Sequence, residues 1–485
     1  MSMEDGLHGK NRLSRSESPA KIGIVHFGPG AFFRAFSAIY TDDVLQEHGG
    51  DWGIAAVSLK SPTTRDQLAE QDNLYTAVEL AESGKKERVV RSISSVFVAP
   101  EDPGAIVDLL SVDNVKLVTL TITEKGYCHS PATGDLNGDH EDIIHDLKNL
   151  SEPKSAIGFL VAGLARRWRA GQAPFTIVSC DNLPSNGQVL RKLVLQFAKL
   201  VDKELAKWID RNAKFPSTMV DRITPATTAQ DVEELENSTG FYDPACVVHE
   251  PFRQWVIEDD FVAERPAWEM AGAQFVTSVD AHELMKLRCL NGTHSSLAYL
   301  GYLAGYVTIA EVSNNSSFAA FCLGLWRDEI LPTLPQPEGE DLNAYCKGLL
   351  ARYQNAAIRH KTWQIAMDGS QKLPQRILGT ISDNLANGIV PKGLCLAVAA
   401  WIRYVGGIDE QGKEIDVRDP LAFTLKQLLD AAGSAQEKVQ SILEVSEIFD
   451  SRLANNPVFL RELVDAYQRI EALGVEATIE AHINA

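Results

Sequence analysis

Residues 21–45 have the sequence KIGIVHFGPGAFFRAFSAIYTDDVL and determine the expected fold class. The apolar run at 22–27 has the length of a buried strand, and a helical pattern follows it after a glycine turn. In that turn, Gly28 and Gly30 would let a phosphate approach the backbone, and the start of the helix would supply amide donors. Phe33 stands at the third position of the G-x-G-x-x-G motif, so the fingerprint is incomplete. Both a dinucleotide site and an ordinary turn remain open at this point.

The chain around this stretch alternates between strand and helix patterns. Further strands are expected at 52–59, 90–98, 116–123 and 175–179, and helices separate them, as at 156–170 and 187–205. Such alternation predicts an α/β fold with a mainly parallel sheet that helices cover on both faces.

Beyond residue 283 strand patterns become rare and long helical patterns dominate, at 342–353, 394–405 and 457–473. A chain of 485 residues exceeds the size at which a single core keeps growing, so more than one domain is expected. The expected division is a disordered lead at 1–20, a dinucleotide-binding domain at 21–284 and a mostly helical domain at 285–485.

The composition excludes several classes of protein. A formal net charge of −19 argues against nucleic acid and against anionic membrane surfaces as partners. The seven cysteines are scattered without a Cys-x-x-Cys pair, so neither a disulfide framework nor a zinc site is expected. The polar first twenty residues and the lack of a long apolar run indicate neither a signal peptide nor a membrane span. A cytoplasmic protein is expected, and a monomer, since nothing in the sequence demands an interface.

The second expected strand lacks the acidic residue that commonly holds the ribose hydroxyls of NAD. The sequence there is SLKSPTTRD at 58–66, which places Lys60 beside the strand end and Arg65 and Asp66 further on. A lysine at this position could meet a 2′-phosphate, or it could be a solvated loop charge. NAD is therefore the preferred cofactor, with NADP not excluded.

A second stretch, ELMKLRCLNGTHSSLAYLGYLAG at 283–305, places polar groups inside an apolar helical pattern. In an α-helix Asn291 would lie about 140° and His294 about 80° from Lys286, so the three fit on one side. A partly desolvated lysine is a plausible general base, and an amide can donate to a developing alkoxide. Glu283 is placed to modulate the ammonium or to pass its proton outward. The alternative is a surface lysine followed by an Asn-Gly helix end.

Seven short sequence blocks, which follow one another along the chain, carry a resemblance to a known protein family. They are GPGAFFRAF at 28–36, TITEKGYC at 121–128, SCDNLPSNG at 179–187, TMVDRI at 218–223, EPFRQWVIEDDF at 250–261, MKLRCLNGTHSSLAYLGYLAG at 285–305 and TWQIAMDGSQKLPQR at 362–376. In these blocks the chain resembles the mannitol dehydrogenase family of polyol-specific long-chain dehydrogenases from about residue 20 to 470. One departure is Phe36, where relatives often carry histidine; packing is expected for it.

The resemblance implies a Rossmann-type domain, a mostly α-helical C-terminal domain and metal-independent hydride transfer in the cleft between them. It implies a catalytic group in which Lys286 is the general acid/base, Asn182 and Asn291 polarise the reacting oxygen, and His294 aligns the substrate. It further implies roles in cofactor binding for Gly28, Gly30, Phe32 and Glu124, in substrate binding for Asp221, Lys372, Arg359 and His360, and in proton relay for Glu283 and Glu124.

The blocks at 250–259 and 359–376 resemble the fructuronate reductase branch of that family, which implies D-mannonate and D-fructuronate as the substrate pair. The basic residues Arg359, His360 and Lys361, with Lys372 and Arg376 nearby, suit an anionic sugar acid. Interconversion of mannitol and fructose stays open as the alternative. A nucleotide-binding sensor without catalysis is the remaining hypothesis, against which the Lys286, Asn291 and His294 group argues.

Overall fold

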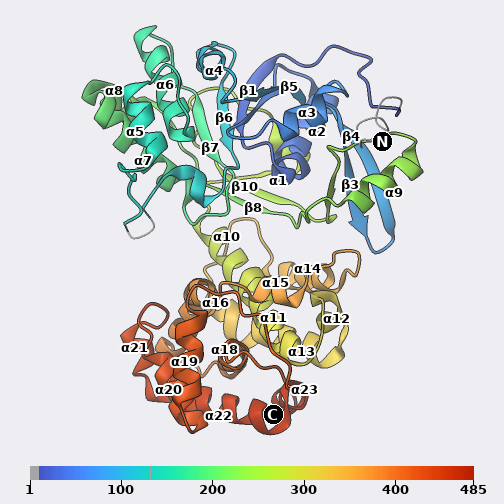
Figure 1. Ribbon diagram of the computed structural model, residues 1–485, viewed down its shortest axis with the longest axis vertical. Helices are drawn as coiled ribbons and strands as arrows, with labels where there is room; N and C mark the ends of the chain where they lie inside the picture. The colour runs from blue at the N-terminus through green and yellow to red at the C-terminus, as the bar shows by residue number, and fades with distance from the viewer. Residues whose placement is uncertain (1–9, 131–132) are drawn as a thin grey trace, which may run out of the picture. The chain divides into compact units, whose positions relative to one another are not determined.

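The computed structural model describes residues 10–130 and 133–485. The chain divides into two compact units, Met1–Asp280 and Ala281–Ala485, which are described separately below (Figure 1). No helix in the described ranges is long and apolar enough to cross a membrane.

The centre of the first unit is a five-stranded, fully parallel sheet in the order β5-β2-β1-β6-β7. Its strands are β1 (Ile22–Phe27), β2 (Gly53–Ser58), β5 (Ile93–Val98), β6 (Leu117–Leu120) and β7 (Thr176–Ser179). The chain order reverses between β1 and β6, as it does in Rossmann folds, where the ligand binds at the carboxyl ends of the strands. The expected α/β fold with a Rossmann-type sheet is confirmed.

Both faces of this sheet are covered, which explains why its strands are continuous apolar runs. Val25 and Phe27 point to one face and pack in a core with α4, α6 and α7, whereas Ile24 points to the other face and packs with α1 and α2. The helices of this unit are α1 (Ala31–Ala35), α2 (Ser37–His48), α3 (Thr63–Ala69), α4 (Pro103–Leu110), α5 (Glu141–Lys148), α6 (Ala156–Arg169), α7 (Asn186–Val201), α8 (Lys203–Asn212) and α9 (Ala229–Thr239), with 3-10 turns η1 (Glu124–Tyr127) and η2 (Trp268–Ala271).

Two smaller sheets complete the first unit. One has the order β4-β3-β9, and the other has the order β11-β10-β8. Their strands are β3 (Tyr75–Ala81), β4 (Gly84–Val90), β8 (Thr218–Asp221), β9 (Val247–His249), β10 (Gln254–Glu258) and β11 (Gln274–Val276). The strand expected at 90–98 is present as β5 from Ile93, whereas its first residue, Val90, is the last residue of β4 in a different sheet.

The structure corrects two further expectations in this unit. The helix expected at 187–205 is broken at Asp202, whose carboxylate caps α8 by accepting from the amides of Glu204 and Leu205. Residues 1–9 of the expected disordered lead lie outside the described residues. Residues 10–20 contain no helix or strand but are anchored, since Arg15 donates to the carbonyls of Asp72 and Ile93.

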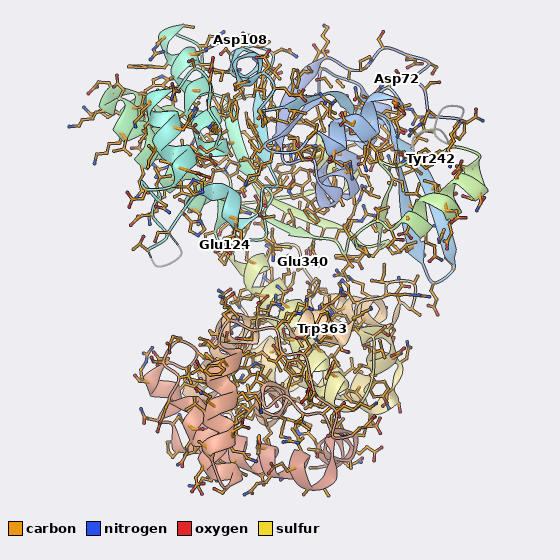
Figure 2. All side chains as sticks on the ribbon, viewed as in Figure 1. Asp72, Asp108, Glu124, Tyr242, Glu340 and Trp363 are labelled. Atoms are coloured by element: carbon orange, nitrogen blue, oxygen red, sulfur yellow. The ribbon has the colours of Figure 1, made fainter. Side chains whose placement is uncertain are left out.

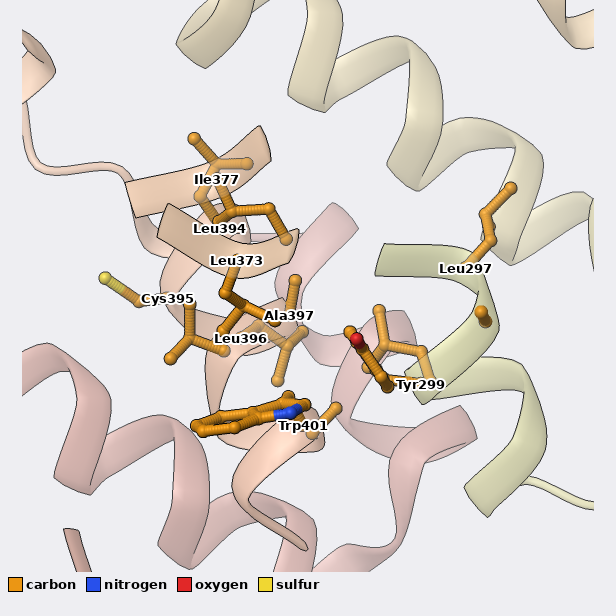
Figure 3. Packing of buried hydrophobic residues seen from close by; sticks show 14 of the residues in the cluster. Leu297, Tyr299, Leu373, Ile377, Leu394, Cys395, Leu396, Ala397 and Trp401 are labelled. Carbon is orange, nitrogen blue, oxygen red and sulfur yellow. The ribbon is translucent and has the colours of Figure 1, made fainter. Parts of the chain in front are cut away.

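The second unit is helical and packs around α18 (Lys392–Val405), which is buried on almost every side and contacts α11 and α22. Figure 3 shows Trp401 of this helix in the core with Tyr299 and Leu373. The other α-helices are α10 (Asp280–Met285), α11 (Thr293–Leu303), α12 (Ile309–Asn314), α13 (Ser316–Gly324), α14 (Leu342–Gln354), α15 (Thr362–Ala366), α16 (Gly369–Leu373), α17 (Gly379–Ala386), α19 (Ala422–Ala431), α20 (Ala435–Leu443), α21 (Ser451–Ala454), α22 (Pro457–Leu473) and α23 (Val475–Ile483).

Three π-helical segments interrupt these α-helices, and one 3-10 turn joins them. The π segments are η3 (Lys286–Gly292), η4 (Leu325–Ile330) and η6 (Pro374–Leu378), and the 3-10 turn is η5 (Leu331–Thr333). Since π turns are rare and frequently lie at functional sites, η3 and η6 mark a candidate functional region of this unit.

Candidate active site

The glycine turn after β1 has the form that a dinucleotide site requires. Gly28 has φ +92°, and a Cβ there would lie 2.2 Å from the carbonyl oxygen of Thr121. A Cβ on Gly30 would meet nothing closer than 3.9 Å, so the surface above Gly30 is open. No side chain caps the start of α1 at Gly30, which leaves its first amides available to a ligand. The turn therefore fits a phosphate group at the edge where the strand order reverses.

His26 supports this turn from below, and the sequence analysis did not single it out. Its ring stacks on Phe33 at 3.6 Å between centroids, and its Nε2 lies 3.2 Å from the Gly28 carbonyl oxygen. The other ring nitrogen lies 2.7 Å from Thr119 Oγ1. Complete burial lowers the pKa of His26 to about 3, so the ring is neutral at ordinary pH. A histidine inside an otherwise apolar strand was the available signal.

A strained backbone follows β6 at the same edge of the sheet. Thr123 has φ 61° and ψ 164°, a region that only glycine populates readily. The Asp181 carboxylate holds it there, because Oδ1 accepts from the Thr123 amide at 2.8 Å and Oδ2 accepts from the Ile122 amide at 3.1 Å. Asp181 was also missed, and its bonds tie the segment containing Glu124 to the loop containing Asn182. Strain that the surroundings enforce is typical of ligand sites.

Both predicted site residues on these loops are exposed. Asn182 directly follows Asp181, and Glu124 opens the short turn η1, where its carboxylate lies 3.5 Å from His129 Nε2 (Figure 2). Asn186, buried next in the loop, donates to the carbonyl oxygens of Asp181 and Thr218. Glu124 and Asn182 therefore lie in the loops that follow β6 and β7, which the Asp181 carboxylate ties together.

A cavity of about 740 Å³ lies at the carboxyl ends of β2 and β5. Lys60 lines it and makes no ion pair within the described ranges, whereas Arg65 forms a two-bond pair with Glu101. The other lining residues include Asp102, Asp142, His145, Glu152 and Lys154. The lysine expected at the strand end is present, and acidic groups surround the same cavity.

Three further residues of the first unit have clear places. Asp221 is buried and is the last residue of β8, where it pairs across the sheet with Gln254. Phe32 is half-buried and stacks on Phe36 at 5.0 Å. Phe36 is fully buried and also contacts Tyr40 and Trp255, so its expected packing role is confirmed.

In the second unit, the stretch around Lys286 differs from the expected α-helix. Residues Lys286–Gly292 form a π-helix, in which hydrogen bonds join residues five apart. Lys286 and Asn291 are separated by five positions, so they lie nearer to one side of the helix than the 140° of an α-helix would allow. A Cβ on Gly292 would lie 2.6 Å from the carbonyl oxygen of Arg376, so only glycine fits at this position. The close approach allows η3 to pack against η6.

His294 follows one turn later on α11 and is buried among aromatic rings. Its ring lies 5.3 Å from those of both His360 and Tyr353, and the Tyr353 hydroxyl donates to the Leu290 carbonyl at 2.7 Å. The pKa of His294 is lowered well below its usual value, first by burial and then by the neighbouring basic groups His360, Arg376, Arg352 and Lys372. Its buried Nε2 has no hydrogen-bond partner in the described part of the chain. A neutral imidazole with one open nitrogen can bind a substrate hydroxyl.

The remaining predicted residues of this unit differ in their surroundings. The Lys372 ammonium donates to the Met367 carbonyl at 2.5 Å and lies 3.4 Å from the Ile365 carbonyl. Arg359 is exposed, although its neighbour His360 stacks on His294. Glu283, partly exposed, lies one turn before Lys286 on α10.

Together these features define what each unit can do chemically. The first unit has a glycine turn that fits a phosphate at the switch point of a Rossmann sheet, with a strained polar loop beside it. The second unit supplies a lysine, an amide and a neutral imidazole within nine residues of one helix. A general base and uncharged donors are the groups that oxidation of a secondary alcohol requires.

Sequence comparisons agree with this chemistry. The mannitol dehydrogenase Rossmann domain matches residues 22–270, and the mannitol dehydrogenase C-terminal domain matches residues 278–471. An uncharacterised oxidoreductase of Escherichia coli, YdfI, is 46% identical over 458 residues, which cover 94% of each chain. The D-mannonate oxidoreductase of Escherichia coli is 44% identical over 475 residues, which cover 97% of each chain.

A solved structure is similar over the whole chain. The mannitol 2-dehydrogenase of Pseudomonas fluorescens, in a ternary complex with NAD and D-mannitol, is 38% identical to this chain. The alignment has a TM-score of 0.81 and covers 99% of this chain and 98% of the other.

Proposed function

We propose, from the premise that the chain belongs to the mannitol dehydrogenase family, that it oxidises D-mannonate to D-fructuronate with NAD and catalyses the reverse reduction. Membership makes the chain an oxidoreductase acting on polyols or sugar acids. The choice of a sugar acid is supported by 44% identity to a D-mannonate oxidoreductase. The observation that carries it is the cluster of basic side chains near His294, which include Arg376, Arg352 and Lys372.

The glycine turn fits the proposed cofactor. We assign the phosphates of NAD to Gly28 and Gly30, where the space is open and the helix amides are uncapped. We assign contacts with the remaining parts of NAD to Phe32 and Glu124. When bound, NAD supplies the group that accepts or returns the hydride.

The chain's own residues would manage the proton and the developing charge. Lys286 takes the proton of the reacting hydroxyl during oxidation and returns it during reduction. The amides of Asn182 and Asn291 donate to the reacting oxygen as it becomes negative. His294 binds the substrate as a neutral imidazole, because burial prevents its protonation.

We assign the outer contacts as follows. Asp221 and His360 would bind substrate hydroxyls, Lys372 would reach the distal end of the substrate, and Arg359 would contribute positive charge toward a carboxylate. Glu283 and Glu124 would exchange the Lys286 proton with solvent. The Arg359 side chain is exposed, and its neighbour His360 stacks on His294.

A screen of NADH and NADPH consumption tests the proposal. The ketoses D-fructuronate, D-tagaturonate and D-fructose are compared at equal concentration. We expect the highest kcat/KM with D-fructuronate and NADH. A clear preference for D-fructose would instead favour the second candidate, mannitol 2-dehydrogenase, which the similarity to the Pseudomonas fluorescens enzyme supports.

A further inference from the structure

Arg376 lies on η6, beside the segment that carries Lys286 and Asn291, and no carboxylate among the described residues pairs with its charge. Its side chain is partly buried, and its Nη1 donates to the Ser295 hydroxyl at 3.0 Å. Within residues 10–130 and 133–485, the Arg376 guanidinium has no other hydrogen bond and no ion pair. A neutral hydroxyl is thus the sole partner that the described residues give to a largely desolvated cation.

The groups around Arg376 make this isolation unusual. Its pKa is lowered chiefly by burial, and the groups that act against burial are the hydroxyls of Tyr299 and Tyr353 rather than a carboxylate. Burying a charge costs free energy unless an opposite charge compensates it. The buried Arg288 of the same unit shows the usual solution, because its guanidinium donates to the Asp383 carboxylate at 2.6 Å. In the part of the chain that the structure describes, Arg376 has no carboxylate partner of this kind.

The fold fixes the position of Arg376 relative to the helix that carries Asn291 and His294. Its carbonyl oxygen packs against Gly292, the residue after Asn291. Its guanidinium binds Ser295, the residue after His294. A ligand that reaches both His294 and Arg376 would therefore span only a short stretch of this helix, which suits a small sugar acid.

Lys372 is the competing candidate for an anionic group, and its bonds argue against it. Its ammonium already donates to the Met367 carbonyl at 2.5 Å and lies 4.0 Å from an Asp368 carboxylate oxygen. Both interactions compensate its charge within the protein. Arg376, by contrast, uses Nη1 for Ser295 and keeps its Nε and Nη2 edge, which is the edge that binds a carboxylate with two parallel hydrogen bonds.

We propose that Arg376, oriented by the Ser295 hydroxyl, binds the carboxylate of a sugar-acid substrate and thereby selects it over neutral polyols and ketoses. This assignment rests on the proposed function, since it presupposes that the second unit binds the substrate. It makes Arg376 a specificity-determining residue that is distinct from the proton-transfer group. The compensation that the buried cation lacks in the protein is then supplied by the substrate.

Steady-state kinetics of the full-length variants Arg376→Met and Arg376→Lys test this proposal, with D-fructuronate and D-fructose as substrates and NADH as cofactor. We expect Arg376→Met to lower kcat/KM for D-fructuronate roughly 10- to 150-fold, the equivalent of a hydrogen bond to a charged group, mainly through KM. The value for D-fructose should change less than threefold. Arg376→Lys should be intermediate, since it keeps the charge but loses the two-bond geometry.

A matched control and the melting temperature separate specificity from folding. Arg403→Met removes another partly buried cation of this unit, one that has a carboxylate partner in Glu471, and it should leave the ratio of the two substrates unchanged. The melting temperature of Arg376→Met should equal or exceed that of the wild type, because an uncompensated cation is removed. A fall in melting temperature with equal losses for both substrates would show a structural role and overturn the proposal.

The remaining outcomes distinguish this proposal from the proposed function. If the wild type reduces D-fructuronate but Arg376→Met retains its full kcat/KM, only the carboxylate assignment is wrong. If the wild type reduces D-fructose and no uronate, both the sugar-acid function and the carboxylate assignment are wrong.

Discussion

Lys286 and Asn291 lie five positions apart within a single π-helical segment, Lys286–Gly292. The π geometry brings residues five apart closer to the same side of the helix than the α-helix expected from the sequence would. A wider turn is retained here although it is intrinsically less favourable than the α-helix, and Gly292 permits the close contact with Arg376 that accompanies it. The local conformation thus supports a joint role for a proton-accepting amine and an amide donor.

The two asparagines provide the first prediction. Asn291→Ala and Asn182→Ala should each raise the activation barrier by about 2.7–4 kcal/mol, seen as a fall in kcat, because each removes a donor to the developing alkoxide. Asn343→Ala, on the exposed face of α14, is the control and should be silent. Steady-state rates within threefold of the wild type for either variant would remove that asparagine from the mechanism.

The glycine turn gives a paired prediction. Gly28→Ala should destabilise the first unit, because its Cβ would collide with the Thr121 carbonyl and φ +92° disfavours alanine. Gly30→Ala should fold normally, since its Cβ enters open space, but should bind NADH more weakly by occupying the space above the turn. Thermal unfolding and calorimetric titration with NADH measure the two effects. Normal NADH affinity in a folded Gly30→Ala protein would place the cofactor elsewhere.

Lys60 leads to a prediction about the preference between NADH and NADPH, which differ by the phosphate at the 2′ position. Because it lines the cavity after β2 without an ion pair in the described ranges, it can attract a 2′-phosphate, while the acids around that cavity limit the gain. We expect measurable activity with NADPH below that with NADH. Lys60→Asp should lower kcat/KM for NADPH and preserve it for NADH. An unchanged NADPH to NADH ratio would show that Lys60 does not contact the cofactor.

His294 predicts a specific dependence of stability on pH. Its pKa in the folded protein lies well below 6.5, the value for an unfolded chain. At pH values between the folded and the unfolded pKa, the unfolded chain therefore binds a proton that the folded chain does not. Its contribution to stability is therefore present above about pH 6.5 and is lost as pH falls, at about 1.36 kcal/mol per pH unit. His294→Asn should reduce this slope in urea unfolding between pH 5 and 6.5.

Two results would contradict this account of His294. An unchanged slope in His294→Asn would mean that the ring is protonated in the folded state. Loss of one limb of the pH–rate profile in the same variant would mean that His294 acts as an acid or base rather than as a neutral binding group.

The sequence predicted the parts of this fold that local patterns encode. The strand at Ile22–Phe27 and its glycine turn were identifiable because a buried parallel strand is a continuous apolar run. The long helices α6, α14 and α22 were identifiable because their apolar positions recur at helical spacing. The break at Asp202 was missed because apolar periodicity continues across it.

Long-range relationships could not be predicted in this way. The bonds from Asp181 to the amides of Ile122 and Thr123 join loops that meet only once the parallel sheet has formed. The π turn at Lys286 depends on tertiary packing through Gly292. Arg376 resembled any other basic residue of its segment until the absence of a carboxylate around it, in the described part of the chain, became visible.

The most direct test of the central claim is the turnover of Lys286→Ala with D-fructuronate and NADH, measured from pH 6 to 10 beside an NADH titration. Lys347→Ala, an exposed lysine on α14, is the control. The proposed chemistry predicts that Lys286→Ala loses turnover at every pH while its NADH affinity stays close to that of the wild type. Near-normal rates across this pH range in a variant that lacks the Lys286 amine would contradict it.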